Sequence, residues 1–381
     1  FNLTMGKGEK EKALFYIGNA ATMLFLSGVV LTVITELFLE PLLVGFGSPQ
    51  NVLPYARTYT GITAIGFPFL ILSAGGGHLI RADGSPSMAM ISNLAGAVIN
   101  TVLDALFVFG FNMGMQGAAL ATVIGQFVAA AIIVWYLCRF KTAPLSLSHF
   151  RPKLSVTGFV AKLGTANFFN QIAMIVQIVM NKSLTYYGSQ SVYGESIPLA
   201  CAGIITKVGM VFFSICIGLS QGMQPIVSFN YGAGNYKKVK QAYRLAAGIG
   251  TIISVIAFFA FQIFPRQLIG IFGSSQNEAY YTFAVRYFRI YMFFTFLNAI
   301  QPISSNFFTA IGKPGKGIFL SLTRQIIFLL PLIVIFPLFL GVDGIMYAGP
   351  IADFIAAMVS MILIYKEFGK INKLEEATCE S

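Results

Sequence analysis

Residues 218–226, GLSQGMQPI, followed by residues 230–234, NYGAG, form the stretch that decides the fold. This stretch ends a long apolar segment, residues 197–227, and leads into a loop that carries Lys237 and Lys238. One helix needs roughly 20 apolar residues to cross a bilayer core of about 30 Å. Residues 197–227 are therefore predicted to span a membrane, and the glycine-rich stretch is predicted to end that span.

Nine further segments are long and apolar enough to span a membrane. The ten predicted spans are residues 13–37, 55–80, 87–109, 116–137, 157–184, 197–227, 241–264, 279–311, 316–340 and 344–368. Hydrophobic residues make up 56% of the 381 residues and charged residues only 10%, whereas soluble domains carry about 25% charged residues. The sequence therefore predicts an all-α polytopic membrane protein and excludes an ordinary soluble domain.

Basic residues gather in every second loop between the predicted spans. They are Lys7, Lys10, Lys12, Arg81, Arg139, Lys141, Arg151, Lys153, Lys237, Lys238, Lys240, Arg244, Lys313, Lys316, Lys366, Lys370 and Lys373. Such loops stay on the cytoplasmic side, so both ends of the chain are predicted to be cytoplasmic, in a bacterial inner membrane. The net charge of +11 follows from this orientation, and no nucleic-acid partner is predicted because the basic residues form no separate domain.

The sequence offers little for enzymatic or metal chemistry. Its four cysteines show no CxxC spacing, so neither a disulfide framework nor a metal site is indicated. No HExxH element occurs, and no loop holds the carboxylate cluster that Mg²⁺ requires. The chain is predicted not to be an enzyme and to use no cofactor.

Three glycine-containing patterns occur twice. Residues 6–12, 82–86 and 114–117 resemble residues 232–238, 310–314 and 341–344, at offsets of 226, 228 and 227 residues. Each pair falls at the same point of the predicted topology, which indicates an internal duplication.

The second copy of the repeat begins with two predicted spans that have no counterpart ahead of the first copy. We therefore expect a complete protein of twelve helices in two six-helix lobes, of which this sequence holds ten. The predicted divisions are a truncated N-lobe at residues 1–138, a cytoplasmic interlobe linker at 139–156, a C-lobe at 157–368 and a cytoplasmic tail at 369–381.

The motifs favour one family among the transporters that have such a repeat. The stretch at residues 218–234, the Ala-x-Gly-x-Pro turns and the Gly-x-x-Gly helix openings resemble the MATE (multidrug and toxic compound extrusion) family, over essentially the whole chain. The resemblance implies the MATE-type fold, a DinF-like and MepA-like branch, and a sequence that lacks the family's first two helices. It also implies antiport of amphipathic organic cations coupled to H⁺ or Na⁺.

A polar stripe runs along the predicted span at residues 87–109. Asn93, Asn100 and Asp104 share one face at 3.6 residues per turn. Asp104 lies roughly 9 Å below the outer end of its helix, and Tyr59 and Thr122 lie at similar depth on two other spans. Their oxygens suit a small hard cation, and a buried Asp104 could equally carry a proton.

The resemblance to the MATE family implies the same residues for the cation site. Asn100 and Asp104 match the branch's Asn-x-x-x-Asp pattern, and Tyr59 and Thr122 resemble the partners at its cation site. The branch also takes an Asp from its first helix, which this sequence lacks. The alternative is that Asp104 only forms hydrogen bonds with neighbouring helices.

Three charged residues lie near the midplane of the predicted C-lobe. Lys207, Arg324 and Asp353 are each about 15 Å from a helix end. We expect Arg324 and Asp353, on consecutive spans, to form a structural ion pair, with Lys207 near them or facing a cavity. A role of the pair in transport is the alternative.

A second set of C-lobe residues could line a substrate cavity. The amides on the span at residues 157–184 approximate one face, and methionine gives an adaptable surface; the candidates are Gln171, Gln177, Asn181, Met174 and Lys207. The alternative role of the amides is interhelical hydrogen bonding, worth about 0.6 kcal/mol each.

The leading hypothesis is a monomeric antiporter that exports small organic cations across the lipid bilayer by alternating access. A lipid-linked oligosaccharide flippase shares the architecture, but it would favour a strongly cationic cavity, and only Lys207 is expected to supply such a charge. A third hypothesis is a fragment without transport activity.

Overall fold

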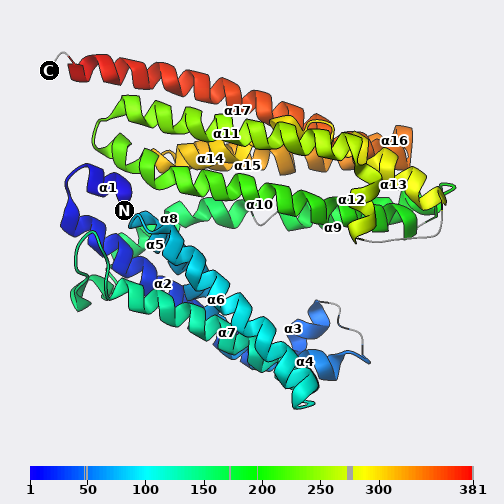
Figure 1. Ribbon diagram of the computed structural model, residues 1–381, viewed down its shortest axis with the longest axis horizontal. Coiled ribbons are helices and arrows are strands. Elements are labelled where there is room, and N and C mark those ends of the chain that lie inside the picture. Colours follow the sequence, from blue (N-terminus) through cyan, green and yellow to red (C-terminus); the bar gives the residue numbers. More distant parts are fainter. Residues whose placement is uncertain (47, 49, 171–172, 195, 273–277, 380–381) are drawn as a thin grey trace. The chain divides into compact units, whose positions relative to one another are not determined.

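The computed structural model describes the chain except residues 47, 49, 171–172, 195, 273–277 and 380–381, and it describes side chains except also at 165–170, 173–175, 272, 279 and 377–379. All regular elements in the described part are helices, as Figure 1 shows. The chain divides into two compact units, Phe1–Ala161 and Lys162–Ser381. The segment predicted as a linker, residues 139–156, belongs to the first unit.

The first unit is built around α2, α5, α6 and α7. Its helices are α1 (Asn2–Gly6), α2 (Lys10–Leu37), α3 (Leu39–Gly45), α4 (Leu53–Ile65), α5 (Phe67–Ala82), α6 (Pro86–Ala105), the π-helix η1 (Leu106–Gly110), α7 (Gly114–Leu137) and the 3₁₀-helix η2 (Leu147–Phe150). Helix α8 (Leu154–Asn170) continues into the second unit. Helix α5 packs against α2 and α7, and α6 packs against α7.

The second unit contains longer helices around an aromatic core. They are α9 (Ala173–Ser189), α10 (Ser196–Gly232), α11 (Tyr236–Ile263), α12 (Pro265–Phe272), α13 (Glu278–Tyr291), the 3₁₀-helix η3 (Thr295–Leu297), α14 (Ile300–Ala310), α15 (Pro314–Leu322), the π-helix η4 (Thr323–Leu329), α16 (Leu330–Leu340) and α17 (Val342–Cys379). Helix α10 packs against α11 and α14 (Figure 1). Phe283, Phe288, Phe307 and Phe308 fill the centre of this unit.

Seven helices of the described part are long and apolar enough to cross a membrane, and an eighth span results if α4 and α5 are counted as one. Those two helices are bent by 56°, just before Pro68, whose ring cannot donate to the preceding helical turn. The predicted span at residues 279–311 is divided into α13, η3 and α14. The predicted span at 157–184 comprises α8 and α9, which are separated by residues outside the description. The predicted spans at 55–80 and 279–311 are therefore each built from more than one helix.

The backbone repeats the sequence duplication. Six of the seven described glycines with positive φ form three pairs, Gly8 and Gly234 (82° and 75°), Gly84 and Gly312 (both 76°), and Gly114 and Gly341 (54° and 59°). Residues other than glycine rarely adopt this conformation, which explains why these positions recur at nearly one offset. The short helices α3 and α12, which the sequence did not suggest, follow α2 and α11 at equivalent points.

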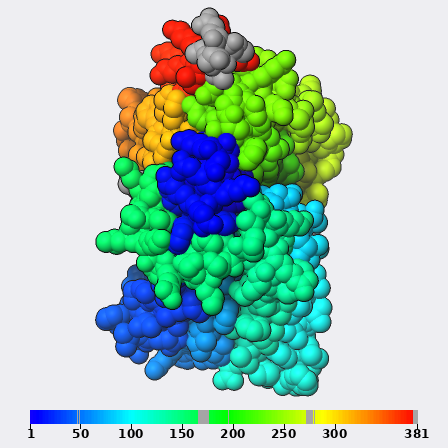
Figure 2. All heavy atoms as spheres, turned by 90° about the vertical axis from the view of Figure 1, so that its left-hand side faces the viewer, coloured from blue at the N-terminus to red at the C-terminus, as the bar shows by residue number. Residues whose placement is uncertain are grey.

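The segment at residues 139–156 is tied to α2 by its backbone. The Asn19 amide donates to the His149 carbonyl at 3.0 Å and accepts from the Lys153 N–H at 2.8 Å. The Thr22 hydroxyl donates to the Phe150 carbonyl at 2.8 Å. Figure 2 shows the first residues of the chain (dark blue) beside this segment (green), where the rings of Phe1 and Phe140 are 5.7 Å apart. The segment therefore packs as part of the first unit.

The predicted cytoplasmic tail is a continuation of a helix. Residues 369–379 extend α17, Ile371 is buried, and the Lys240 ammonium lies 2.5 Å from the Glu375 carboxylate. An apolar contact and an ion pair thus hold this part of α17 on α11.

Candidate functional site

A polar pocket of about 220 Å³ lies in the first unit between α5, α6 and α7. Its lining consists of small and polar residues: Ser73, Asn93, Gly96, Ala97, Asn100, Thr122, Gly125, Gln126 and Ala129. The predicted stripe on α6 therefore faces this pocket, except that Asp104 is not part of the lining.

The pocket depends on close approach of α6 and α7. A Cβ on Gly125 would lie 2.7 Å from the Gly96 carbonyl, and one on Gly96 would lie 2.9 Å from the Gly125 carbonyl. The Ser92 hydroxyl also donates across this contact to the Ala129 carbonyl at 2.9 Å. Small residues at a membrane helix contact allow backbones to approach in this way, and here they bring Asn100 opposite Thr122.

Asn100 and Thr122 are joined directly. The Asn100 amide nitrogen donates to the Thr122 hydroxyl oxygen at 3.4 Å, and that hydroxyl donates to the Ala118 carbonyl at 2.9 Å. The arrangement leaves the Asn100 carbonyl oxygen without a donor among the described residues. The pair therefore presents a free carbonyl oxygen, together with the second N–H of the Asn100 amide.

Two buried oxygens in the same helices have no hydrogen-bond partner among the described residues. They are Oδ1 of Asp104, one turn beyond Asn100, and Oε1 of Gln126, one turn beyond Thr122. An unsatisfied buried acceptor costs about 1–3 kcal/mol, and more when it is charged. The sequence analysis missed Gln126, although its position four residues after Thr122 in an apolar helix was the available signal.

The structure does not join all four residues predicted for the cation site. It brings Asn100 and Thr122 together, whereas no hydrogen bond links the side chains of Asp104 or Tyr59 to this pair in the described part. The Tyr59 backbone carbonyl accepts from the Thr63 hydroxyl at 2.9 Å. The role of Tyr59 stays a prediction.

The second unit contains a buried ion pair. Nε of Arg324 lies 2.5 Å from Oδ1 of Asp353, and the Asn298 amide donates to Oδ2 of Asp353 at 3.0 Å. The side chains of Arg324 and Asp353 are 14% and 3% exposed. Arg324 lies in the π-helix η4 and Asp353 in α17, so the pair joins two consecutive spans.

This ion pair borders a pocket of about 340 Å³ between α9, α10, α13, η4 and α17. Gln177 lines the pocket and donates to Asn181 at 3.1 Å, so these two candidates interact with each other. Lys207 is exposed and is not part of the lining. The predictions for Gln171 and for the Met174 side chain fall outside the described residues.

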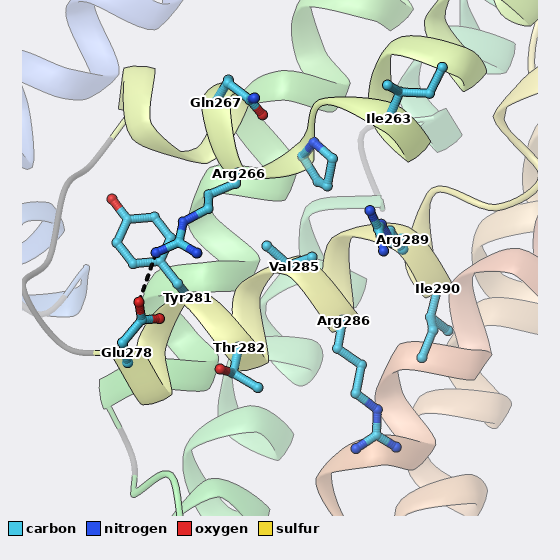
Figure 3. Close-up of a pocket in the computed structure, with 11 residues that line it drawn as sticks. Ile263, Arg266, Gln267, Glu278, Tyr281, Thr282, Val285, Arg286, Arg289 and Ile290 are labelled. Atoms are coloured by element: carbon cyan, nitrogen blue, oxygen red, sulfur yellow. Dashed lines mark hydrogen bonds and ion pairs between the residues drawn. The ribbon is translucent and has the colours of Figure 1, made fainter.

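A larger pocket, of about 670 Å³, lies in the second unit where α12 and α13 meet. Figure 3 shows its three arginines pointing in different directions. Arg266 pairs with Glu278 at 2.9 Å, and Arg286 pairs with Asp343 at 2.8 Å. These charges do not converge on one point in the pocket, so the pocket presents no single charged site.

The described part of the chain contains neither a hydrolase-type nucleophile turn nor a cluster of metal ligands. Residues 218–222, GLSQG, do match the GxSxG spacing of a hydrolase nucleophile. They lie inside α10, however, where the buried Ser220 donates to the Ile217 carbonyl, rather than at a strand-to-helix turn. Among the described residues, no group of three His, Cys, Asp or Glu side chains is placed to hold a metal.

Comparison with known proteins decides the family. The family model MatE matches residues 4–106 and 168–335. The chain belongs to the MatE family. This MatE-family chain is therefore a multi-pass membrane transporter and not an enzyme.

Its relatives and structural neighbours agree with that assignment. The chain is 27% identical over 342 residues to the multidrug export protein MepA of Staphylococcus saprophyticus. The aligned region covers 89% of this chain and 73% of that protein. It is 25% identical over the same length to MepA of Staphylococcus aureus. An outward-facing multidrug resistance MATE family transporter of the MOP superfamily matches with a TM-score of 0.89 at 21% identity, over 98% of this chain and 82% of that one. A MOP superfamily transporter from Pyrococcus furiosus, described as having a binding pocket of reverse polarity, matches with a TM-score of 0.88 at 20% identity, over 97% and 82%.

Proposed function

We propose that this chain is an antiporter that exports amphipathic organic cations in exchange for H⁺ or Na⁺ by alternating access. The single observation that carries the proposal is the buried, unpartnered Oδ1 of Asp104. MepA, a relative of this chain, is named a multidrug export protein, which supports drugs as the exported class. The transporter is proposed to act as a monomer in a bacterial inner membrane, with both chain ends in the cytoplasm.

The coupling step follows from the acceptor oxygens near Asp104. An ionised carboxylate without a partner is costly inside a membrane, so a proton or a small cation that reaches Asp104 removes that cost. Asn100 and Gln126 offer neutral oxygens on the same two helices, and oxygen is the ligand type that hard cations take. A ligand that favours one conformation in this way shifts the population of inward and outward states.

Dye efflux from a bacterium that lacks its own efflux pumps tests this proposal. Cells that express the parent chain, Asp104→Asn or the control Glu36→Gln would be compared at equal membrane abundance, with Na⁺ and pH varied. Glu36 is an exposed carboxylate on α2 with no described partner, so its neutralisation should leave efflux unchanged.

We expect Asp104→Asn to abolish coupled efflux and Glu36→Gln to retain it. The dependence of the parent's efflux rate on Na⁺ or on pH identifies the coupling ion. Efflux by Asp104→Asn at the parent rate would refute the coupling role. No efflux of any cationic dye by an abundant parent would favour the flippase hypothesis instead.

A further inference from the structure

The pocket of about 340 Å³ in the second unit has an apolar and adaptable lining. Its side chains include Met180, Met210, Met292, Phe213 and Tyr291. Methionine is flexible and polarisable and packs well against aromatic rings. The pocket therefore suits a flat aromatic body rather than a small hydrated ion.

Arg324 supplies uncommitted hydrogen-bond donors to this pocket. A guanidinium has five N–H donors, and Arg324 uses Nε to reach Asp353. Neither of its Nη groups forms a hydrogen bond with a described residue, and its side chain lines the pocket at 14% exposure. The ring of Phe213 lies 5.2 Å from the guanidinium carbon, which helps to fix the plane of the group.

Asp353, by contrast, has no free oxygen. Oδ1 accepts from Arg324 and Oδ2 accepts from Asn298, and the carboxylate is 3% exposed. The neighbouring Gln325 also lines the pocket, and its amide has no partner among the described residues. The polar part of the pocket therefore offers the free donors of Arg324 and the unpaired amide of Gln325, while its carboxylate is already paired.

We propose that this pocket binds an aromatic amphipathic molecule that carries a carboxylate, held by the Nη groups of Arg324 against the methionine and phenylalanine lining. Arginine prefers carboxylates because its planar donors match two oxygens at once. The proposal goes beyond the export of cations, since Arg324 places free donors in this pocket and the Asp353 carboxylate is already paired. The transporter thus accepts acidic or zwitterionic aromatic compounds through its second unit.

Equilibrium binding to the purified chain in lipid nanodiscs tests the proposal. The probes are pyrene-1-carboxylate and the cation 1-pyrenylmethylammonium, which share one ring system and differ in charge, with empty nanodiscs as the background. Arg324→Lys keeps a positive charge beside Asp353 but removes the planar donors. Gly209→Leu fills the pocket, since a Cβ there would lie 3.4 Å from the Met292 methyl group. Lys207→Gln removes an exposed charge from the same helix, α10, and serves as the control.

We expect saturable binding of the carboxylate that depends on Arg324. Any binding of the cation, which belongs to the proposed export class, should not weaken in Arg324→Lys. Charge-assisted hydrogen bonds are worth enough that Arg324→Lys should weaken binding roughly tenfold or more. Gly209→Leu should abolish binding, and Lys207→Gln should retain it. Parent affinity for the carboxylate in Arg324→Lys, or an equal loss of cation binding in that variant, would overturn the proposal. If Arg324→Lys does not fold, Gly209→Leu decides, because undiminished binding by that variant places the ligand elsewhere.

Discussion

The Arg324–Asp353 pair allows the sharpest prediction about stability. Replacing Asp353 by Ala leaves the guanidinium of Arg324 without its counter-ion and the amide of Asn298 without its acceptor. Breaking a buried ion pair by removing one partner costs about 3–5 kcal/mol, and a buried donor that loses its acceptor costs about 1–3 kcal/mol. Because Arg324 is 14% exposed and can turn towards the pocket, we expect a total near the lower end, about 3 kcal/mol.

The double variant Asp353→Ala/Arg324→Met separates the charge from the packing. Methionine keeps most of the volume of arginine and removes the unpaired cation, and apolar replacements of buried ion pairs are often neutral. We therefore expect the double variant to recover most of the stability that Asp353→Ala loses. Equilibrium unfolding of the purified proteins in mixed micelles, together with their abundance in membranes, measures both effects.

Two results would refute this reasoning. Parent stability in Asp353→Ala would mean that the ion pair contributes little to the fold. Normal membrane abundance of Asp353→Ala with lost transport would contradict a bracing role and would assign the pair to the transport cycle.

Two further substitutions test the packing of each unit. Gly125→Ala should separate α6 from α7 and lower the free energy of unfolding by about 1–3 kcal/mol. Gly218→Ala is the control, because a Cβ there meets nothing within 4 Å. Thermal unfolding compares the two variants, and equal melting temperatures would contradict the close contact of α6 and α7. Glu367→Gln should lower the free energy of unfolding by about 1.5–3 kcal/mol, because it removes the buried charge that pairs with Lys313 and Lys316. Replacement of the exposed Glu376 by Gln should leave the stability unchanged. A Glu367→Gln protein as stable as the parent would show that the two ion pairs do not stabilise the fold.

Sequence patterns predict where a residue lies along its helix, but they predict less well which residue of another helix it contacts. Apolar length locates the spans, and depth counted from the helix ends brings Arg324 level with Asp353. The same count places Asp104 level with Thr122, whereas the structure joins Asn100 to Thr122. The bend between α4 and α5 depends on how Gly66 packs: a Cβ there would lie 3.0 Å from Val123. A proline at residue 68 indicates a kink but not its size or its partner.

The rotation of each helix about its axis is what the sequence leaves open. The contacts of Gln126 and Asn298 depend on which side of a helix meets its neighbour. Small residues such as Gly96 decide this through close backbone contacts. A polar side chain in an apolar helix therefore shows that it needs a partner, but not which one.

The duplication relates the two pockets to each other. At the offset of 227 residues that separates Gly114 from Gly341, Arg324 corresponds to Ala97 and Asp353 corresponds to Gln126. Ala97 and Gln126 line the pocket of the first unit, and Arg324 and Asp353 line that of the second. These two positions thus face a pocket in both units, while their side chains differ in charge. The first unit keeps unpaired acceptor oxygens on α6 and α7, which favour a cation or a proton. In the second unit the carboxylate at the position of Gln126 is paired with the arginine at the position of Ala97, which leaves the Nη donors of that arginine for the anion proposed above.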